Sequence, residues 1–138
     1  YSLMLNLLEE QFFRSDELTF PEKTRKFLNL KLAKNEHEVF SVVYLDTQHQ
    51  LIGYEEIFRR TIDGAAVYPR EVVKCCLHNN AAAVIFLMPS IGIPEPSKSD
   101  IVITKRLIEA LKLVDVRVLD HIVNGGANRV SMAERGLF

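Results

Sequence analysis

An apolar run followed by an irregular loop and a capped helix constrains this sequence more than any other stretch. The run covers residues 81–88, the loop covers 89–96, and Ser97-Lys98-Ser99-Asp100 begins a periodic segment. In that segment, apolar residues recur at the spacing of one buried helix face: Ile103, Leu107, Ile108, Leu111 and Val114. The apolar run indicates a buried strand. We therefore expect the functional site where this strand ends and the helix begins.

The rest of the chain predicts a hairpin and then alternating helices and strands. Residues 38–46 and 51–58 are rich in β-branched and aromatic residues on either side of a polar turn, which predicts a β-hairpin. Helical patterns cover 3–14, 20–34 and 69–78, further strands are expected at 116–123 and 128–132 around a turn at 124–127, and 61–67 indicates a loop with a short edge strand. This order predicts the α/β class, with a mixed β-sheet flanked by helices.

Two of these helices also predict which side chains are buried. The second helix should turn Thr24, Phe27, Leu28 and Leu32 inward, and the third should bury Val72, Val73, Cys76 and Leu77. Cys75 and Cys76 are neighbours that point in different directions on a helix, so we expect reduced thiols and no disulfide between them. We divide the chain into an N-terminal helical segment, 1–34, and a domain, 35–138.

Composition narrows the class of protein. The chain has 138 residues, 48% hydrophobic and 25% charged, which suits one soluble globular core. A net charge of −1 supplies no global field for nucleic acid or an anionic membrane. No apolar run approaches the roughly 18 residues of a membrane span, so we expect a cytoplasmic protein with no membrane partner. The start at Tyr1, inside a helical pattern, suggests a piece of a longer protein.

Three residues are candidates for chemistry, and each has an ordinary structural explanation. Ser97 and Asp100 have the Ser-x-x-Asp spacing of a capping box, in which both side chains bond backbone N–H groups at a helix start. Glu38 lies at a junction between loop and strand, where a Glu is most often an exposed surface residue. Spacing alone favours the structural explanation for all three.

Several ordered motifs resemble the RadC-like branch of the JAB/MPN (JAMM) metalloprotease fold, and they extend over almost the whole chain. They are Glu38-Val39-Phe40 with Leu45-Asp46, Thr61-Ile62-Asp63-Gly64, Tyr68-Pro69-Arg70-Glu71-Val72, Asn80-Ala81-Ala82-Ala83-Val84-Ile85, Pro94-Glu95-Pro96-Ser97, and Leu119-Asp120-His121 through to Gly136-Leu137. The resemblance implies a cytidine-deaminase-like α/β architecture and zinc-dependent hydrolysis of peptide or isopeptide bonds. By position, Glu38 resembles the general base, Ser97 the oxyanion-stabilising residue and Asp100 the third zinc ligand.

The two zinc-binding histidines of that family, from a His-x-His-Pro-Ser-Gly segment, have no counterpart. Counting back from Ser97 by the family spacing gives Leu87 and Pro89, and aligning Met88-Pro89-Ser90 with His-Pro-Ser gives Phe86 and Met88. Met sulfur is a poor zinc ligand, and Leu, Phe and Pro offer none, so Asp100 would hold the ion alone. We therefore expect no bound cofactor and no hydrolysis in this copy of the domain.

The remaining histidines do not replace the missing pair. His37 alternates away from Glu38 if the strand has begun there, His49 lies in the hairpin turn, His78 near a helix end and His121 in a late strand. The segment Met88-Pro89-Ser90-Ile91-Gly92 has another property. It can be encoded as ATG CCA TCC ATC GGN, which one base later reads Cys-His-Pro-Ser-Gly. A local frame slip is therefore an alternative origin of this loop.

Three functions are compatible with the sequence. The first is an inert JAB/MPN domain that keeps a peptide or protein partner, or a second copy of itself, for instance at a strand edge near 65–68. The second is an active zinc hydrolase whose loop is altered. The third is DNA association, suggested only by the family's link to DNA repair. The charge balance and the lack of an interleaved aromatic and basic patch argue against the third, since Arg59-Arg60 alone is an ordinary solvated pair.

Overall fold

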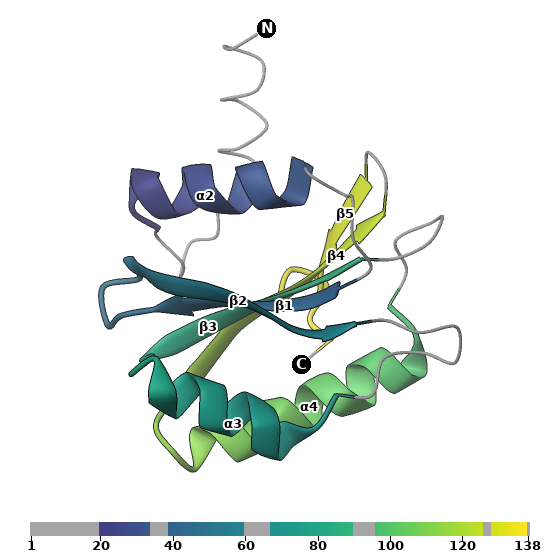
Figure 1. The fold of residues 1–138 in the computed structure, drawn as a ribbon. Coiled ribbons are helices and arrows are strands. Elements are labelled where there is room, and N and C mark those ends of the chain that lie inside the picture. The colour runs from purple at the N-terminus through teal and green to yellow at the C-terminus, as the bar shows by residue number, and fades with distance from the viewer. Residues whose placement is uncertain (1–19, 34–38, 60–66, 90–95, 126–127, 138) are drawn as a thin grey trace, which may run out of the picture.

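A single mixed sheet with helices on both faces forms the described part of the molecule (Figure 1). The computed structural model describes residues 20–33, 39–59, 67–89, 96–125 and 128–137. The helices are α2 (Glu22–Ala33), α3 (Pro69–His78) and α4 (Lys98–Lys112), and the strands are β1 (Val39–Leu45), β2 (Leu51–Arg59), β3 (Ala83–Pro89), β4 (Arg117–Gly125) and β5 (Asn128–Ser131). The predicted α/β class, with a mixed sheet flanked by helices, is confirmed.

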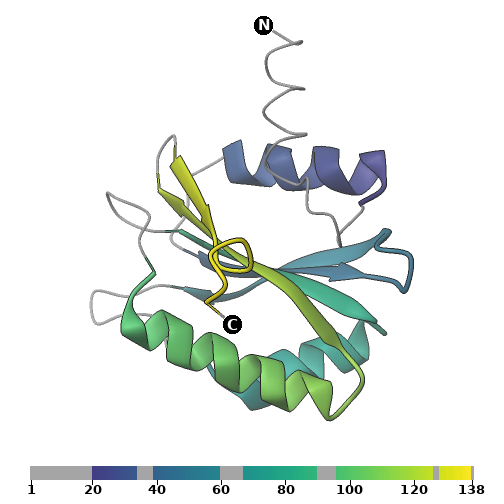
Figure 2. The same ribbon diagram turned by 180° about the vertical axis from the view of Figure 1, so that it is seen from behind.

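The strand order is β2-β1-β3-β4-β5. The β1–β2 hairpin is antiparallel, as predicted, and β1 also pairs antiparallel with β3. β3 and β4 run parallel, with α4 as the crossover between them, and β5 returns antiparallel to β4. Figure 2 shows the same layers from behind, with α2 on one face of the sheet and α4 on the other. β3 is therefore the central strand, as its apolar run predicted.

The side chains of β3 alternate between two hydrophobic layers. Val84, Phe86 and Met88 face the layer shared with α3 and α4, whereas Ala83, Ile85 and Leu87 face the layer shared with α2. A strand has a side-chain period of two, so only an uninterrupted apolar sequence can fill both layers. This arrangement explains why the sequence keeps eight consecutive apolar residues before the loop.

The helices predicted at 20–34, at 69–78 and after Ser97 are confirmed in their positions, and one predicted buried face is corrected. Thr24 and Leu28 of α2 are buried, and Val72 and Cys76 of α3 are buried, as expected. Leu77 was expected in the buried stripe of α3, but 57% of it is exposed, so that prediction is wrong. Leu77 follows Cys76 by about 100° around the helix, which turns it from the sheet toward solvent.

Some of the sequence predictions concern residues that the structure does not describe, and one turn was placed incorrectly. The helix predicted at 3–14 and residues 61–66 of the loop predicted at 61–67 lie outside the described residues, and the division of the chain at residue 34 stays a prediction. β4 continues to Gly125, so the predicted turn at 124–127 was placed to begin too early. Within the described ranges, no helix is both long enough and apolar enough to cross a bilayer.

Candidate functional site

The C-terminal end of β3, the start of α4 and the start of β1 all lie at the same end of the sheet's strands. Ser41 pairs with Leu87 in the antiparallel β1–β3 ladder, so the chain enters β1 at the edge where β3 leaves it. Glu38, the predicted general base, immediately precedes β1 and lies outside the described residues. The topology thus brings the start of β1 to the start of α4, while the position of the Glu38 side chain stays a prediction.

Ser97 and Asp100 form a complete capping box at the start of α4. The Asp100 backbone N–H donates to Ser97 Oγ at 3.1 Å, and the Ser97 backbone N–H donates to Asp100 Oδ2 at 2.8 Å. Each side chain thereby satisfies a backbone group that would otherwise lack an intrahelical partner. The Asp100 carboxylate also lies in the first turn, where the helix dipole favours a negative charge. The structure brings these two predicted site residues together, with their side chains engaged in the cap.

Three of the four strand positions that the resemblance assigns to zinc ligands belong to the hydrophobic core. Phe86 is fully buried, and Leu87 and Met88 are each only 7% exposed. Phe86 packs against Phe40 with ring centroids 5.3 Å apart. None of these side chains offers the nitrogen or oxygen donor that zinc prefers. In the portion of the chain that the structure describes, no three His, Cys, Asp or Glu side chains come together as a metal site.

A buried histidine of the sheet contacts α4 near the start of that helix. His121, in β4, is fully buried, and its ring makes edge contacts with Phe40 and Phe86 at centroid distances of 5.8 Å. His121 Nδ1 lies 2.6 Å from Thr104 Oγ1, and that hydroxyl donates to the Asp100 carbonyl at 2.7 Å. Since the hydroxyl proton goes to Asp100, the network assigns the proton on Nδ1 to the bond with Thr104.

The environment of His121 keeps its imidazole neutral. Burial lowers the pKa of His121 to about 4, and the nearby Asp100 carboxylate only partly opposes this shift. Nε2 has no hydrogen-bond partner among the described residues. The sequence placed His121 correctly in a late strand but gave no sign of its link to α4. The one available signal was a polar pair, Asp120-His121, between the apolar pairs Val118-Leu119 and Ile122-Val123 of the strand.

Asp120, next to His121, fixes the segment that follows β5. Its carboxylate accepts hydrogen bonds from Ser131 Oγ at 2.5 Å, the His121 backbone N–H at 2.7 Å and the Ala133 backbone N–H at 3.1 Å. Burial raises the pKa of Asp120, while these three bonds lower it. Sequence reasoning missed this role, which is structural. The side chain holds residues 131–133 against β4.

The sequence from residue 18 to residue 137 matches the RadC-like JAB domain family. This chain belongs to that family. It is 54% identical over 133 residues to a UPF0758 protein of Marinobacter nauticus, 54% identical over 132 residues to one of Vibrio cholerae, and 58% identical over 123 residues to one of Cellvibrio japonicus. These matches cover 95%, 94% and 88% of the chain, respectively.

The matches to these relatives extend over different shares of their lengths. They cover 59% of the Marinobacter protein, 54% of the Cellvibrio protein and 82% of the Vibrio protein. The chain therefore spans little more than half the length of two of the relatives it matches. Membership of the RadC-like JAB domain family agrees with the mixed five-stranded sheet and its flanking helices.

Proposed function

We propose that this RadC-like JAB domain binds a peptide or protein partner and does not hydrolyse peptide bonds with zinc. The observation that supports this proposal most is the burial of Phe86, Leu87 and Met88 at the end of β3. Zinc hydrolysis needs three protein ligands and an open position for a water molecule. Among the described residues at the end of β3 and the start of α4, only Asp100 is a family zinc ligand, and its Oδ2 already accepts a hydrogen bond from the Ser97 backbone N–H.

The fold itself does not depend on that chemistry. The two hydrophobic layers and the cap of α4 are formed by residues that need no metal. A domain can lose catalytic ligands and keep its packing, because core packing and site chemistry use different residues. The proposal includes a cytoplasmic location, which the two free cysteines, Cys75 and Cys76, support.

The test is a hydrolysis assay on the full chain with added zinc. We expect a fluorogenic isopeptide-linked substrate to be cleaved no faster by the wild-type chain than by the Asp100→Ala variant. The reason is that removing the last family ligand should cost nothing if no metal-bound water is formed. Zinc-dependent turnover that Asp100→Ala abolishes would contradict the proposal.

The second candidate function is an active zinc hydrolase. One possible codon string for residues 88–92 encodes Cys-His-Pro-Ser-Gly when it is read one base later. In that frame the histidine falls at position 89, which is also where counting back from Ser97 places a ligand. Sequencing the gene across this loop tests the idea directly. A codon string without His-Pro-Ser-Gly in any frame removes it.

A further inference from the structure

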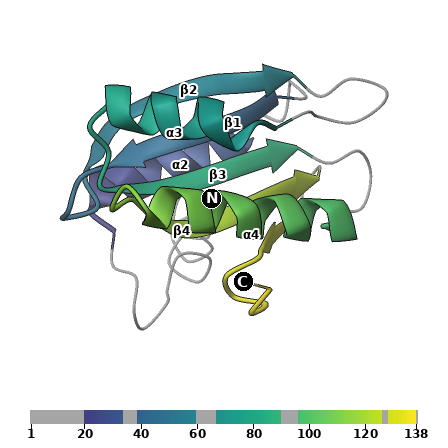
Figure 3. The ribbon, with the colours of Figure 1, turned by 90° about the horizontal axis from the view of Figure 1, so that it is seen from below.

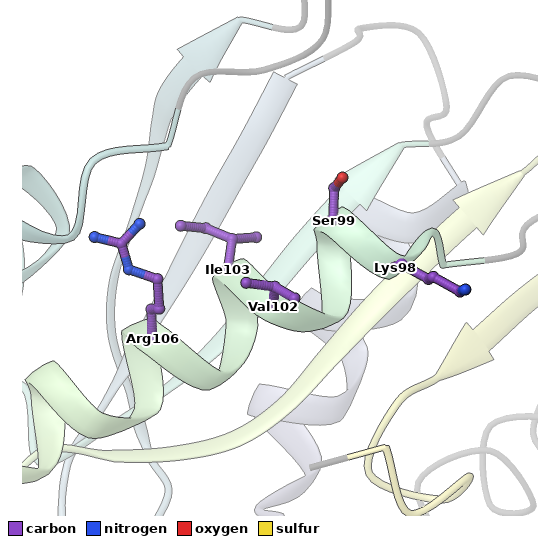
Figure 4. Close-up of a pocket in the computed structure, with 5 residues that line it drawn as sticks. All are labelled: Lys98, Ser99, Val102, Ile103 and Arg106. Carbon is purple, nitrogen blue, oxygen red and sulfur yellow. The ribbon is translucent and has the colours of Figure 1, made fainter.

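A groove lies beside the cap of α4, and the side chains that line it take no part in the cap. Five residues from the first nine positions of α4 line it (Figure 4). They are Lys98, Ser99, Val102, Ile103 and Arg106. The volume of the groove is about 360 Å³. Asp100 is not among them, because it lies about 100° around the helix from Ser99. The groove therefore neighbours the candidate site without sharing its side chains.

The groove has cations at its ends and aliphatic side chains between them. In Figure 4, Lys98 and Arg106 extend in opposite directions along α4, with Val102 and Ile103 between them. Lys98 and Arg106 are eight positions apart, so their Cα atoms lie about 12 Å apart along the helix axis. Each end therefore offers a positive charge, and the middle offers apolar surface.

Ile103 packs partly against the hydrophobic layer shared by α3 and α4, whereas Val102, the other aliphatic side chain of the groove, does not. Val102 is 58% exposed, although it is a large aliphatic residue. Figure 3 shows that α3 lies beside the C-terminal half of α4, which leaves the N-terminal half uncovered by that helix. Among the described residues, the one ion pair joins Lys26 to Glu22, so Lys98 and Arg106 have no acidic partner there. The chain as a whole has a charge of −1, so this positive surface is local.

We propose that this groove binds an extended acidic peptide in which carboxylates flank aliphatic side chains. A strand rises about 3.3 Å per residue, so carboxylates at least about four residues apart would match Lys98 and Arg106, whose side chains point away from each other. Val102 and Ile103 would cover the aliphatic side chains between those carboxylates. The inference rests on the partner-binding role proposed above and names the surface that provides it.

The groove suits an acidic peptide better than a nucleic acid. Single-stranded nucleic acids are bound by aromatic side chains that stack on bases and by a row of cations along the backbone. This groove is lined by two cations and two aliphatic residues, with no aromatic side chain among the five. The aliphatic centre would lie unused against a sugar-phosphate backbone.

Fluorescence anisotropy with a short labelled peptide, in which two Glu residues flank three aliphatic residues, tests the inference on the full chain. We expect saturable binding that weakens with ionic strength and falls at least about tenfold in Arg106→Glu. Lys105→Glu is the matched control, since Lys105 is exposed on α4 outside the groove and its substitution changes the charge equally. It should change the dissociation constant by less than about twofold.

The same experiment distinguishes an acidic peptide from the other possible occupants of the groove, a second copy of the chain and single-stranded DNA. Val102→Asp should abolish peptide binding, and a peptide with Lys in place of Glu should not bind. No binding of the acidic peptide, or equal weakening by Arg106→Glu and Lys105→Glu, would overturn the proposal. So would a dimer that Val102→Asp dissociates, or tighter binding of single-stranded DNA than of the peptide. Running the assay in EDTA separates it from the hydrolysis test, because peptide binding then does not depend on whether zinc supports catalysis.

Discussion

At the scale of single residues, His121 joins the sheet to the helix that carries the candidate site. Its ring makes edge contacts with both Phe40 and Phe86, and its Nδ1 bonds the hydroxyl of Thr104 on α4. A protonated imidazole in this apolar site would carry a buried charge without a direct partner, which is costly. The packing of α4 on the sheet therefore favours the neutral form of His121.

The stability of the domain should consequently depend on pH through His121. The folded pKa of about 4 lies below the unfolded value of 6.5, so the unfolded chain binds more protons between these values. The stabilising contribution of His121 is present above pH 6.5 and is lost as pH falls toward 4, by at most about 3 kcal/mol. The pKa of Asp120 is raised, so its contribution changes in the opposite direction over the acidic range.

Comparison with His121→Gln isolates this effect, because the variant keeps Asp120. Urea denaturation should show a gap in the free energy of unfolding between wild type and variant at neutral pH. That gap should shrink as pH falls from 6.5 toward 4, since only the wild-type chain can take up the proton. A gap that is constant over this range, or a His121 ring that titrates near pH 6.5 by NMR in the wild-type chain, would contradict the assignment.

At the scale of elements, the start of α4 tests whether Ser97 acts as a cap. Ser97→Ala removes the acceptor of the Asp100 N–H and should lower the free energy of unfolding by about 1 kcal/mol. Ser97→Asp should keep most of the stability, because Asp is as good an N-cap residue as Ser. Chemical denaturation of the three proteins measures this. If Ser97→Asp destabilises as much as Ser97→Ala, the capping role is wrong.

The packing of α2 on the sheet has its own test. Leu28 is fully buried in the layer with Val43 and Ile85, whereas Leu30 on the same helix is 55% exposed. Leu28→Ala should therefore cost about 2–5 kcal/mol, because it leaves a cavity in that layer. Leu30→Ala should change stability by less than about 0.5 kcal/mol. Equal effects of the two substitutions would mean that α2 does not pack as described.

Elements with strong local patterns could be predicted from the sequence, and side-chain positions that depend on distant partners could not. The apolar run at 81–88 and the Ser-x-x-Asp spacing identify β3 and the start of α4, because both signals are local. The exposure of Leu77 depends on where the sheet lies relative to α3. The link between His121 and Thr104 joins residues 17 apart in sequence, and no periodicity reports it.

At the scale of the whole molecule, two hydrophobic layers hold the sheet between α2 on one face and α3 with α4 on the other. β3 contributes side chains to both layers as far as its C-terminal end, where the family's zinc ligands would be expected. Metal-binding side chains and core side chains thus compete for the same strand positions, and in this sequence the core residues occupy them. The RadC-like JAB fold is therefore complete without a donor set for zinc in its described part.

Zinc content measures this central claim most directly. The full chain and its Asp100→Ala variant are dialysed against micromolar zinc, and bound metal is determined by mass spectrometry. We predict well below one zinc per chain, with no difference between the two proteins, because one carboxylate is too few ligands for a tetrahedral site. One zinc per wild-type chain that is lost in Asp100→Ala would contradict the account.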